Sequence, residues 1–333
     1  MNSTSVADTN PVRGRSVGVV NDAESVSINQ DSITTLATHL VNEFKFTPAS
    51  WDAPVFPSLE SHSIETVVDF MVVGNAVNYC FNDLDTGEKF TVAYMGDEWR
   101  GSYGMWASLH RALVGDVDVF DADYLQTVSE SDVAEIFEPV DGKEIPMPES
   151  RVEQLNAVGE LMEECGGTFR DKFTGEINIY GDDGVVEWLA NTDAYRDESK
   201  YNEIPIRFDK RAQLVVSMLY SKLQGTNHEF SIVDKEAFTV FADYGIPAGL
   251  VANDVLDYDN ELAEKIANGE EIESGSKEEI EIRAATVYVG DQLIHVLNDV
   301  HGIDVGMPVL DYVLWQMRND ADTQAHLTET TAY

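Results

Sequence analysis

Basic residues are scarce in this sequence. Its 333 residues include 21 Lys or Arg against 61 Asp or Glu, which gives a formal net charge of −40. This imbalance argues against a protein that binds the phosphate backbone of duplex nucleic acid. It fits a surface of solvated carboxylates in molar salt, where a Debye length of about 3 Å screens the repulsion of an anionic ligand. We therefore predict a salt-adapted, cytoplasmic protein whose charge reflects its solvent.

Cysteines and long apolar segments are also scarce. The two cysteines, Cys80 and Cys165, have no metal-type spacing and indicate no disulfide framework. The sequence has neither an apolar leader nor a run long enough to cross a membrane. The seven histidines form no HExxH pattern, and no glycine-rich phosphate loop is present. These absences predict a protein without a membrane span, a metal ion or a cofactor.

Apolar residues recur mainly with helical spacing. We predict one mainly α-helical domain over residues 21–333, after a disordered polar tail over residues 1–20. A small β-hairpin is predicted where Tyr79–Phe81 and Phe90–Tyr94 flank Asp85-Thr86-Gly87. Capping residues and helix-initiating prolines predict helices after Asp31, from Ser150 and Ser276, over residues 213–223 and after Pro308.

One carboxylate, Asp243, stands in an apolar run from Phe238 to Val251. An unpaired buried carboxylate costs roughly several kcal/mol, so it requires a partner or a function. We predict a helix over Lys235–Tyr244 that stops at Gly245, and a second helix that begins at Pro247. On that arrangement Asp243 is too early to cap the second helix and lies in the last turn of the first, where the helix dipole disfavours its charge. This setting makes Asp243 the candidate catalytic residue.

Three further groups are candidates for binding, each with a simpler alternative. Lys210-Arg211 begins a helix, where a phosphate could bind, or it neutralises acidic neighbours. Arg283 could orient a catalytic carboxylate, or it pairs with Glu279 one helical turn away. Asp311 and Trp315 share a helix face and could hold a planar heterocycle, or they are an exposed acid beside a core aromatic.

Several segments, in this order, resemble the queuosine 5'-phosphate N-glycosylase/hydrolase family of queuine salvage, over roughly residue 22 to the end. They are Asn78-Tyr79-Cys80-Phe81, Arg111-Ala112-Leu113, Leu155 through Gly166-Gly167-Thr168-Phe169, Tyr195-Arg196-Asp197, Lys210-Arg211-Ala212-Gln213, Phe241-Ala242-Asp243-Tyr244 with Pro247, Glu281-Ile282-Arg283, Asp311-Tyr312 with Leu314-Trp315, and the terminal His326 and Tyr333.

The resemblance implies a mainly helical fold similar to helical DNA glycosylases, and hydrolysis of queuosine 5'-phosphate to queuine and ribose 5-phosphate. It assigns catalysis to Asp243, an aromatic base contact to Phe241, and base recognition to Asp311 and Tyr312. Lys210, Arg211 or Arg196 would then hold the 5'-phosphate, and no metal is required.

This chain departs from the family where Gln316 replaces an acid after Trp315, where Asn82 replaces an aromatic, and where Leu327 and Glu329 replace basic residues. Two alternatives therefore stay open: an enzyme for a related 7-deazaguanine nucleotide, and a non-catalytic binding protein with the same pocket. A glycosylase acting on DNA is a further reading, but the chain lacks a basic stripe.

Overall fold

A computed structural model describes residues 10–84, 86–115, 119–140, 142–319 and 323–333. Its architecture is mainly α-helical, as predicted, and its buried apolar side chains form one continuous cluster. The α-helices of the described residues are α1 (Pro11–Asp22), α2 (Gln30–Glu43), α3 (Ile64–Ala76), α4 (Ser102–Leu113), α5 (Ala122–Leu125), α6 (Glu130–Ile136), α7 (Pro148–Glu164), α8 (Val185–Ala190), α9 (Lys210–Leu223), α10 (Gly245–Ala252), α11 (Asn260–Ala267), α12 (Lys277–His295) and α13 (Met307–Asn319).

The strands are short and pair two by two. Antiparallel pairs join β1 (Val26–Ile28) to β8 (Leu256–Tyr258), β2 (Thr91–Tyr94) to β3 (Asp97–Arg100), and β5 (Glu198–Tyr201) to β6 (Ile204–Arg207), while β4 (Glu176–Ile177) runs parallel to β7 (Ser231–Ile232). These pairs fasten connections between helices and form no common sheet.

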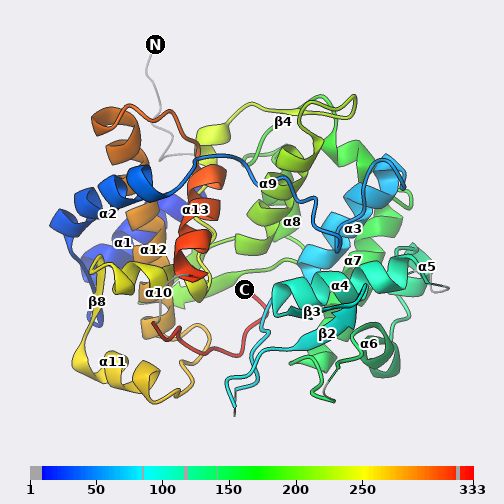
Figure 1. The fold of residues 1–333 in the computed structure, drawn as a ribbon, viewed down its shortest axis with the longest axis horizontal. Helices are drawn as coiled ribbons and strands as arrows, with labels where there is room; N and C mark the ends of the chain where they lie inside the picture. Colours follow the sequence, from blue (N-terminus) through cyan, green and yellow to red (C-terminus); the bar gives the residue numbers. More distant parts are fainter. Residues whose placement is uncertain (1–9, 85, 116–118, 141, 320–322) are drawn as a thin grey trace.

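The helices form two groups (Figure 1). One group contains α1, α2 and α10–α13, with the long α12 packed against α1, α10 and α13. The other contains α3–α9, in which α3 packs on α7 and α9. The chain end lies between them, where the Tyr333 carbonyl accepts a hydrogen bond from the Cys80 amide at 3.0 Å.

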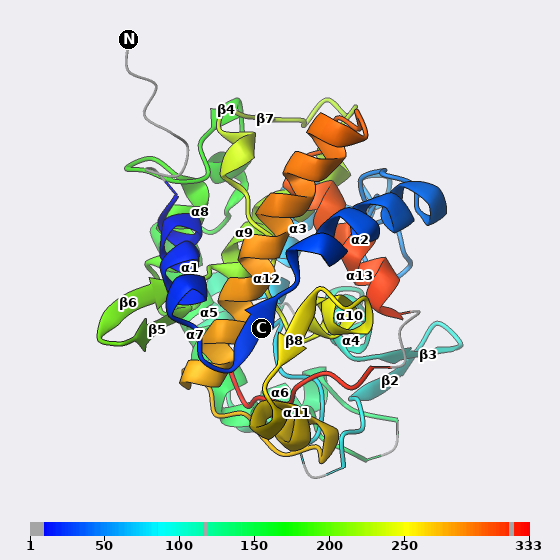
Figure 2. The same cartoon turned by 90° about the vertical axis from the view of Figure 1, so that its left-hand side faces the viewer.

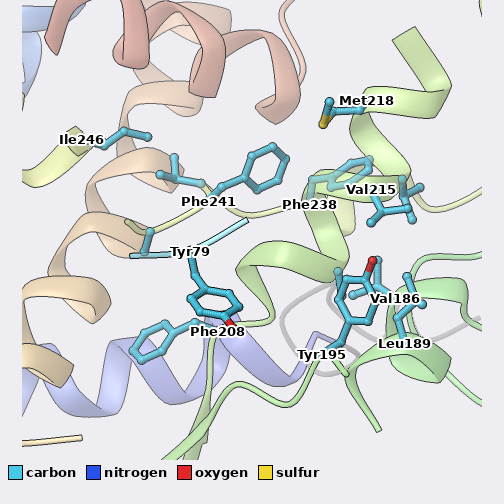
Figure 3. Packing of buried hydrophobic residues seen from close by; sticks show 14 of the residues in the cluster. Tyr79, Val186, Leu189, Tyr195, Phe208, Val215, Met218, Phe238, Phe241 and Ile246 are labelled. Carbon is cyan, nitrogen blue, oxygen red and sulfur yellow. The ribbon is translucent and has the colours of Figure 1, made fainter. Parts of the chain in front are cut away.

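The connection over residues 238–244 crosses between the groups and lies directly on α12. A Cβ atom added to Gly290 of α12 would come within 2.3 Å of a Val240 methyl carbon, so only glycine permits this approach. Figure 2 shows the length of α12, and Figure 3 shows Phe238 and Phe241 of the connection beside Val215 and Met218 of α9. The connection therefore has one side against α12 and the other toward α9.

The predicted tail and hairpin differ from the structure. Residues 1–9 lie outside the described part, but the expected disorder up to residue 20 is wrong from Pro11 on, because α1 packs against α12 there. Thr91–Tyr94 pairs with Asp97–Arg100 and not with Tyr79–Phe81. The reason is the two-residue turn at Met95 and Gly96, whose φ angles of 53° and 89° match a type I′ hairpin.

Asp85 of the expected turn lies outside the described residues. Among the described residues on either side of that turn, the predicted pairing is present in part: Asn82 and Lys89 form a single bridge, and the Phe90 amide donates to the Phe81 carbonyl at 2.9 Å. None of the described helices has the length and apolar character that crossing a bilayer requires. Within the same residues, no cluster of three or more His, Cys, Asp or Glu side chains is placed to hold a metal ion.

Candidate active site

A pocket of about 950 Å³, its open mouth included, lies between the two helix groups. One wall comes from α13 and residues 241–246, and the opposite wall comes from α9 and α4. Of the nine residues that the sequence proposed, six line this pocket: Lys210, Phe241, Asp243, Asp311, Tyr312 and Trp315.

The segment that carries Asp243 is not helical, so the predicted helix over Lys235–Tyr244 is wrong beyond Ala237. Side chains from other helices accept the hydrogen bonds of backbone amides that would otherwise bond within a helix. The Thr239 amide donates to Oε1 of Gln213 at 2.9 Å, and the Phe241 amide donates to Oδ1 of Asp311 at 2.8 Å. These long-range bonds satisfy the backbone in an extended path, which sequence periodicity does not encode.

Asp243 consequently sits before the first turn of α10 and not at the end of a helix. Its Oδ1 accepts hydrogen bonds from the amides of Gly245 at 2.8 Å and Ile246 at 3.1 Å, in the manner of a helix cap. The dipole of α10 therefore favours the negative charge that the predicted arrangement disfavoured. No donor among the described residues bonds to Oδ2, so this oxygen is available to a ligand in the pocket.

Asp311 projects from α13 and is 9% exposed. Burial raises its pKa well above the usual range, and the nearby charge of Asp243 raises it further. The Phe241 amide and Lys210 act in the opposite direction. Asp311 thus links α13 to the 238–244 connection through one oxygen and faces the pocket beside Asp243.

Aromatic side chains form the wall next to Asp311. The rings of Tyr312 and Trp315 are stacked, with centroids 6.1 Å apart and planes inclined by 12°. Tyr103 of α4 stacks on Trp315 at 6.4 Å, and Trp51 lies 6.2 Å from Tyr312. The indole Nε1 of Trp51 is buried without a hydrogen-bond partner among the described residues. This wall suits a planar, partly polar group.

Lys210 is the first residue of α9, and its side chain lines the pocket with 7% of the residue exposed. Burial lowers its pKa, whereas Asp243 and Asp311 act to raise it. The Lys210 amide at this helix start already donates to Oδ2 of Asp197 at 3.1 Å, so this amide is not free for a phosphate. A carboxylate oxygen of Asp197 therefore lies where a phosphate oxygen would meet this amide. That the Lys210 side chain holds a phosphate stays a prediction.

Three other proposed residues lie outside the pocket lining. Arg283 forms two hydrogen bonds to Asp197, at 2.8 and 2.7 Å, and its predicted contact with Glu279 is present at 3.5 Å. Arg211 donates to the carbonyls of Ala76 and Ala194. Arg196 is exposed and pairs with Asp193. Arg283 still acts near the site, since its Nε donates to the carbonyl of Ala242 beside Asp243 at 3.2 Å.

Sequence reasoning missed part of the wall. Trp51, Tyr103 and Trp106 line the pocket, and none was assigned a role from the sequence. Tyr103 and Trp106 are three residues apart on α4, so their shared face is visible in the sequence once a helix is assumed after Gly101. Trp51 lies in an irregular connection, and no pattern in the sequence indicates its position.

Comparisons with known proteins assign the chain to a family. The family model described as queuosine salvage protein matches residues 58–333. The chain belongs to this family. A relative from Sphaerobacter thermophilus, named queuosine 5'-phosphate N-glycosylase/hydrolase, is 33% identical over 323 residues, which is 95% of each chain. Relatives of the same name from Mus musculus and Bos taurus are each 30% identical and align with 75% and 77% of this chain, and with 76% and 77% of their own. The resemblance found from short motifs is confirmed.

Proposed function

We propose that the protein hydrolyses the N-glycosidic bond of queuosine 5'-phosphate and releases queuine and ribose 5-phosphate. Relatives that align with most of the chain are named for this activity. The observation that carries the proposal is the carboxylate of Asp243, which has one oxygen fixed by two backbone amides and the other open to a pocket with an aromatic wall.

On the base side, the aromatic wall receives the heterocycle. Tyr312, Trp315 and Phe241 contact its faces, and Asp311 accepts hydrogen bonds from its guanine-like edge. Queuine is a 7-deazapurine and lacks the N7 atom that could be protonated in a purine. Stabilisation of the transition state must therefore come mainly from the sugar side and from hydrogen bonds at the base edge.

On the sugar side, cleavage of the bond between C1′ and the base nitrogen develops positive charge on the ribose. Asp243 stabilises this charge, either by its field or by transient covalent attachment to C1′. Water then supplies hydroxide to C1′ and a proton to the departing base, which balances the hydrolysis. The amides of Gly245 and Ile246 hold the carboxylate in place, so little reorganisation is needed.

The charge of the chain supports a small nucleotide as the substrate, because a net charge of −40 opposes binding to duplex DNA. It also supports action in the cytoplasm of a salt-adapted cell. We expect the free energy of unfolding to rise as KCl increases from about 0.1 M to about 1 M, where screening removes most repulsion between surface carboxylates. A free energy of unfolding that does not depend on KCl would contradict salt adaptation.

The direct test is to incubate the pure protein with queuosine 5'-phosphate in high salt and to measure free queuine by chromatography. The wild type should release the base, and Asp243→Asn should lower kcat by roughly 10³-fold or more, as expected when a group acting on the reacting carbon is lost. Because Asn can still accept the two amide hydrogen bonds, circular dichroism and thermal unfolding should stay unchanged. Full activity in Asp243→Asn would refute the catalytic assignment. Binding without turnover in the wild type would favour a non-catalytic protein.

A further inference from the structure

Two cations without an ion-pair partner among the described residues lie near Asp243, just outside the residues that line the pocket. They are Lys89, just before β2, and Arg318, in the last turn of α13. In a chain with 61 acids and 21 bases, a carboxylate partner would be easy to supply. Two neighbouring cations left without one form a local positive site, which an anionic ligand could neutralise.

Arg318 lies on the same face of α13 as the pocket residues. It follows Asp311 by seven residues and Trp315 by three, which is the spacing of one helix face. A Cβ atom added to Gly245 would be 3.4 Å from Oδ1 of Asp243 and 3.5 Å from Cγ of Arg318. The Arg318 stem is therefore adjacent to Asp243. Its Nε is buried and has no hydrogen-bond partner in the described part of the chain.

Lys89 approaches from the opposite wall. Its Cδ lies 3.6 Å from the Cβ position of Gly101, next to Phe81, which lines the pocket. Lys89 as a whole residue is exposed, but partial burial of its charged group lowers the pKa of Lys89. The charge of Arg318 lowers this pKa further, whereas the charge of Asp243 raises it. The three charges thus lie within electrostatic range of one another.

The order of groups along α13 matches the order of parts in a mononucleotide. Asp311 is at the deep end with Lys210, Trp315 is in the middle, and Arg318 is at the other end. Seven residues of α-helix span about 10 Å, which is comparable to the length of a nucleotide from base edge to phosphate. Asp243 interacts electrostatically with Asp311 at one end and with Lys89 at the other, as a group facing the sugar should.

We propose that Lys89 and Arg318 bind the 5'-phosphate of the substrate and determine the preference for a nucleotide over a nucleoside. This inference rests on the proposed function and replaces the earlier assignment of the phosphate to Lys210, Arg211 or Arg196. A phosphate monoester dianion neutralises both cations and gives the orphaned Arg318 Nε an acceptor.

The test compares Lys89→Gln, Arg318→Gln and the double variant with the wild type. Each single variant should raise KM for queuosine 5'-phosphate about tenfold, as expected for one charged hydrogen bond, and should affect the hydrolysis of queuosine, which lacks the phosphate, much less. The matched control is Lys277→Gln, which removes an exposed cation that pairs with Glu24 at 3.9 Å and lies outside the pocket lining. This control should retain the wild-type KM.

A second measurement does not depend on turnover. Calorimetry should show that ribose 5-phosphate binds to the wild type and to Lys277→Gln, and binds at least tenfold more weakly to the double variant. Equal binding by the double variant and the wild type, or no binding by the wild type, would overturn the phosphate site. If the wild type released no queuine but the double variant lost ribose 5-phosphate, the proposed reaction would fail while the phosphate site stood.

Misfolding is controlled by Arg318→Lys. This substitution retains the charge and should keep most of the affinity for ribose 5-phosphate, whereas Arg318→Gln should lose it. Affinity lost equally in both variants, with thermal unfolding unchanged, would indicate that the planar guanidinium is required and would still support the site. Affinity retained in both would overturn the role of Arg318.

Discussion

Charged residues on the two sides of the 238–244 connection differ in how completely they are paired. On the α12 side, Arg283 contacts Asp197 and Glu279 and also bonds to the Ala242 carbonyl, so these charges have partners within the protein. On the pocket side, neither Asp243 nor Asp311 forms an ion pair with a described residue, and Lys210 has none either. We define the inner cluster as Asp197, Glu279 and Arg283, and the pocket group as Asp243, Asp311 and Lys210.

This difference separates structure from function. The groups of a buried ion pair that already form all their hydrogen bonds have no donor or acceptor free to bind a ligand. A buried charge without a partner lowers the stability of the protein unless a ligand supplies the opposite charge or a hydrogen bond. The inner cluster should therefore govern stability, and the pocket group should govern activity. The two groups can be tested independently because each is reached by substitutions that spare the other.

The largest expected effect is on the inner cluster. Arg283→Met leaves the carboxylates of Asp197 and Glu279 buried without their cation. We expect the free energy of unfolding to fall by about 4 kcal/mol, the usual cost of breaking a buried pair on one side. Urea denaturation in constant high salt measures this loss. A change below about 1 kcal/mol would mean that the cluster is not a structural unit.

Asp69 of α3 provides a contrast to the paired carboxylates of the inner cluster, because it is buried and the described residues that bond to it are neutral donors. Its Oδ1 accepts from the Phe169 amide at 2.8 Å and from the Thr168 hydroxyl at 3.1 Å, and burial raises its pKa from 3.8 to about 6. The folded state then binds more protons than the unfolded state between these values. Protonated Asp69 therefore stabilises the folded state below about pH 4, and this stabilisation is lost as the pH rises to about 6. The free energy of unfolding should fall by up to about 3 kcal/mol over this range.

Denaturation of the wild type and of Asp69→Asn at several pH values between 4 and 7, in constant high salt, checks this expectation. The amide can accept the same hydrogen bonds but does not titrate in this range. The free energy of unfolding of Asp69→Asn should therefore increase relative to that of the wild type as the pH rises. Parallel pH profiles would show that Asp69 titrates normally.

In the pocket group, Asp311→Asn should lower kcat/KM for queuosine 5'-phosphate by roughly 10–100-fold, the value of charged hydrogen bonds to the base edge. The variant should be at least as stable as the wild type at pH 7, because burial disfavours the charged carboxylate and Asn still accepts from the Phe241 amide. Steady-state kinetics and urea denaturation on the same preparation separate the two effects. Lost stability together with lost activity would place Asp311 with the inner cluster.

The smallest effect is expected at Arg196. This side chain is exposed, pairs with Asp193 on the surface, and lies outside the pocket lining. Arg196→Gln should change KM less than about twofold and the free energy of unfolding by less than about 0.5 kcal/mol. An increase in KM comparable to that of Arg318→Gln would indicate that the phosphate binds near Arg196.

Local signals located the regular helices, but three predicted helix starts are wrong. Asn29 caps α2 in place of Asp31, α7 begins at Pro148 before Ser150, and α10 begins at Gly245, two residues before Pro247. Ser276 caps α12 through the Glu279 amide, and α13 begins one residue before Pro308, as the capping and proline rules imply. The same rules failed over Lys235–Tyr244. In this segment, the side chains of Gln213 and Asp311 on other helices accept hydrogen bonds from the backbone. The residues of the segment itself do not indicate these long-range hydrogen bonds.

The candidate site was predictable where chemistry is concentrated in one residue. Asp243 and Asp311 stand out as carboxylates in apolar surroundings, and the structure brings both to one pocket. The cations were harder to assign. A short sequence window does not tell whether an arginine meets a carboxylate 86 residues away, as Arg283 does, or remains unpaired beside the pocket, as Arg318 does.

The aromatic wall has a practical consequence for measurement. Three of the five tryptophans in the chain, Trp51, Trp106 and Trp315, border the pocket. A heterocycle stacked among these indoles should quench a large part of the intrinsic fluorescence of the protein. Occupancy can then be followed optically, with inactive variants and unlabelled compounds, and a panel of deazapurine nucleotides could be ranked by titration before any product is sought.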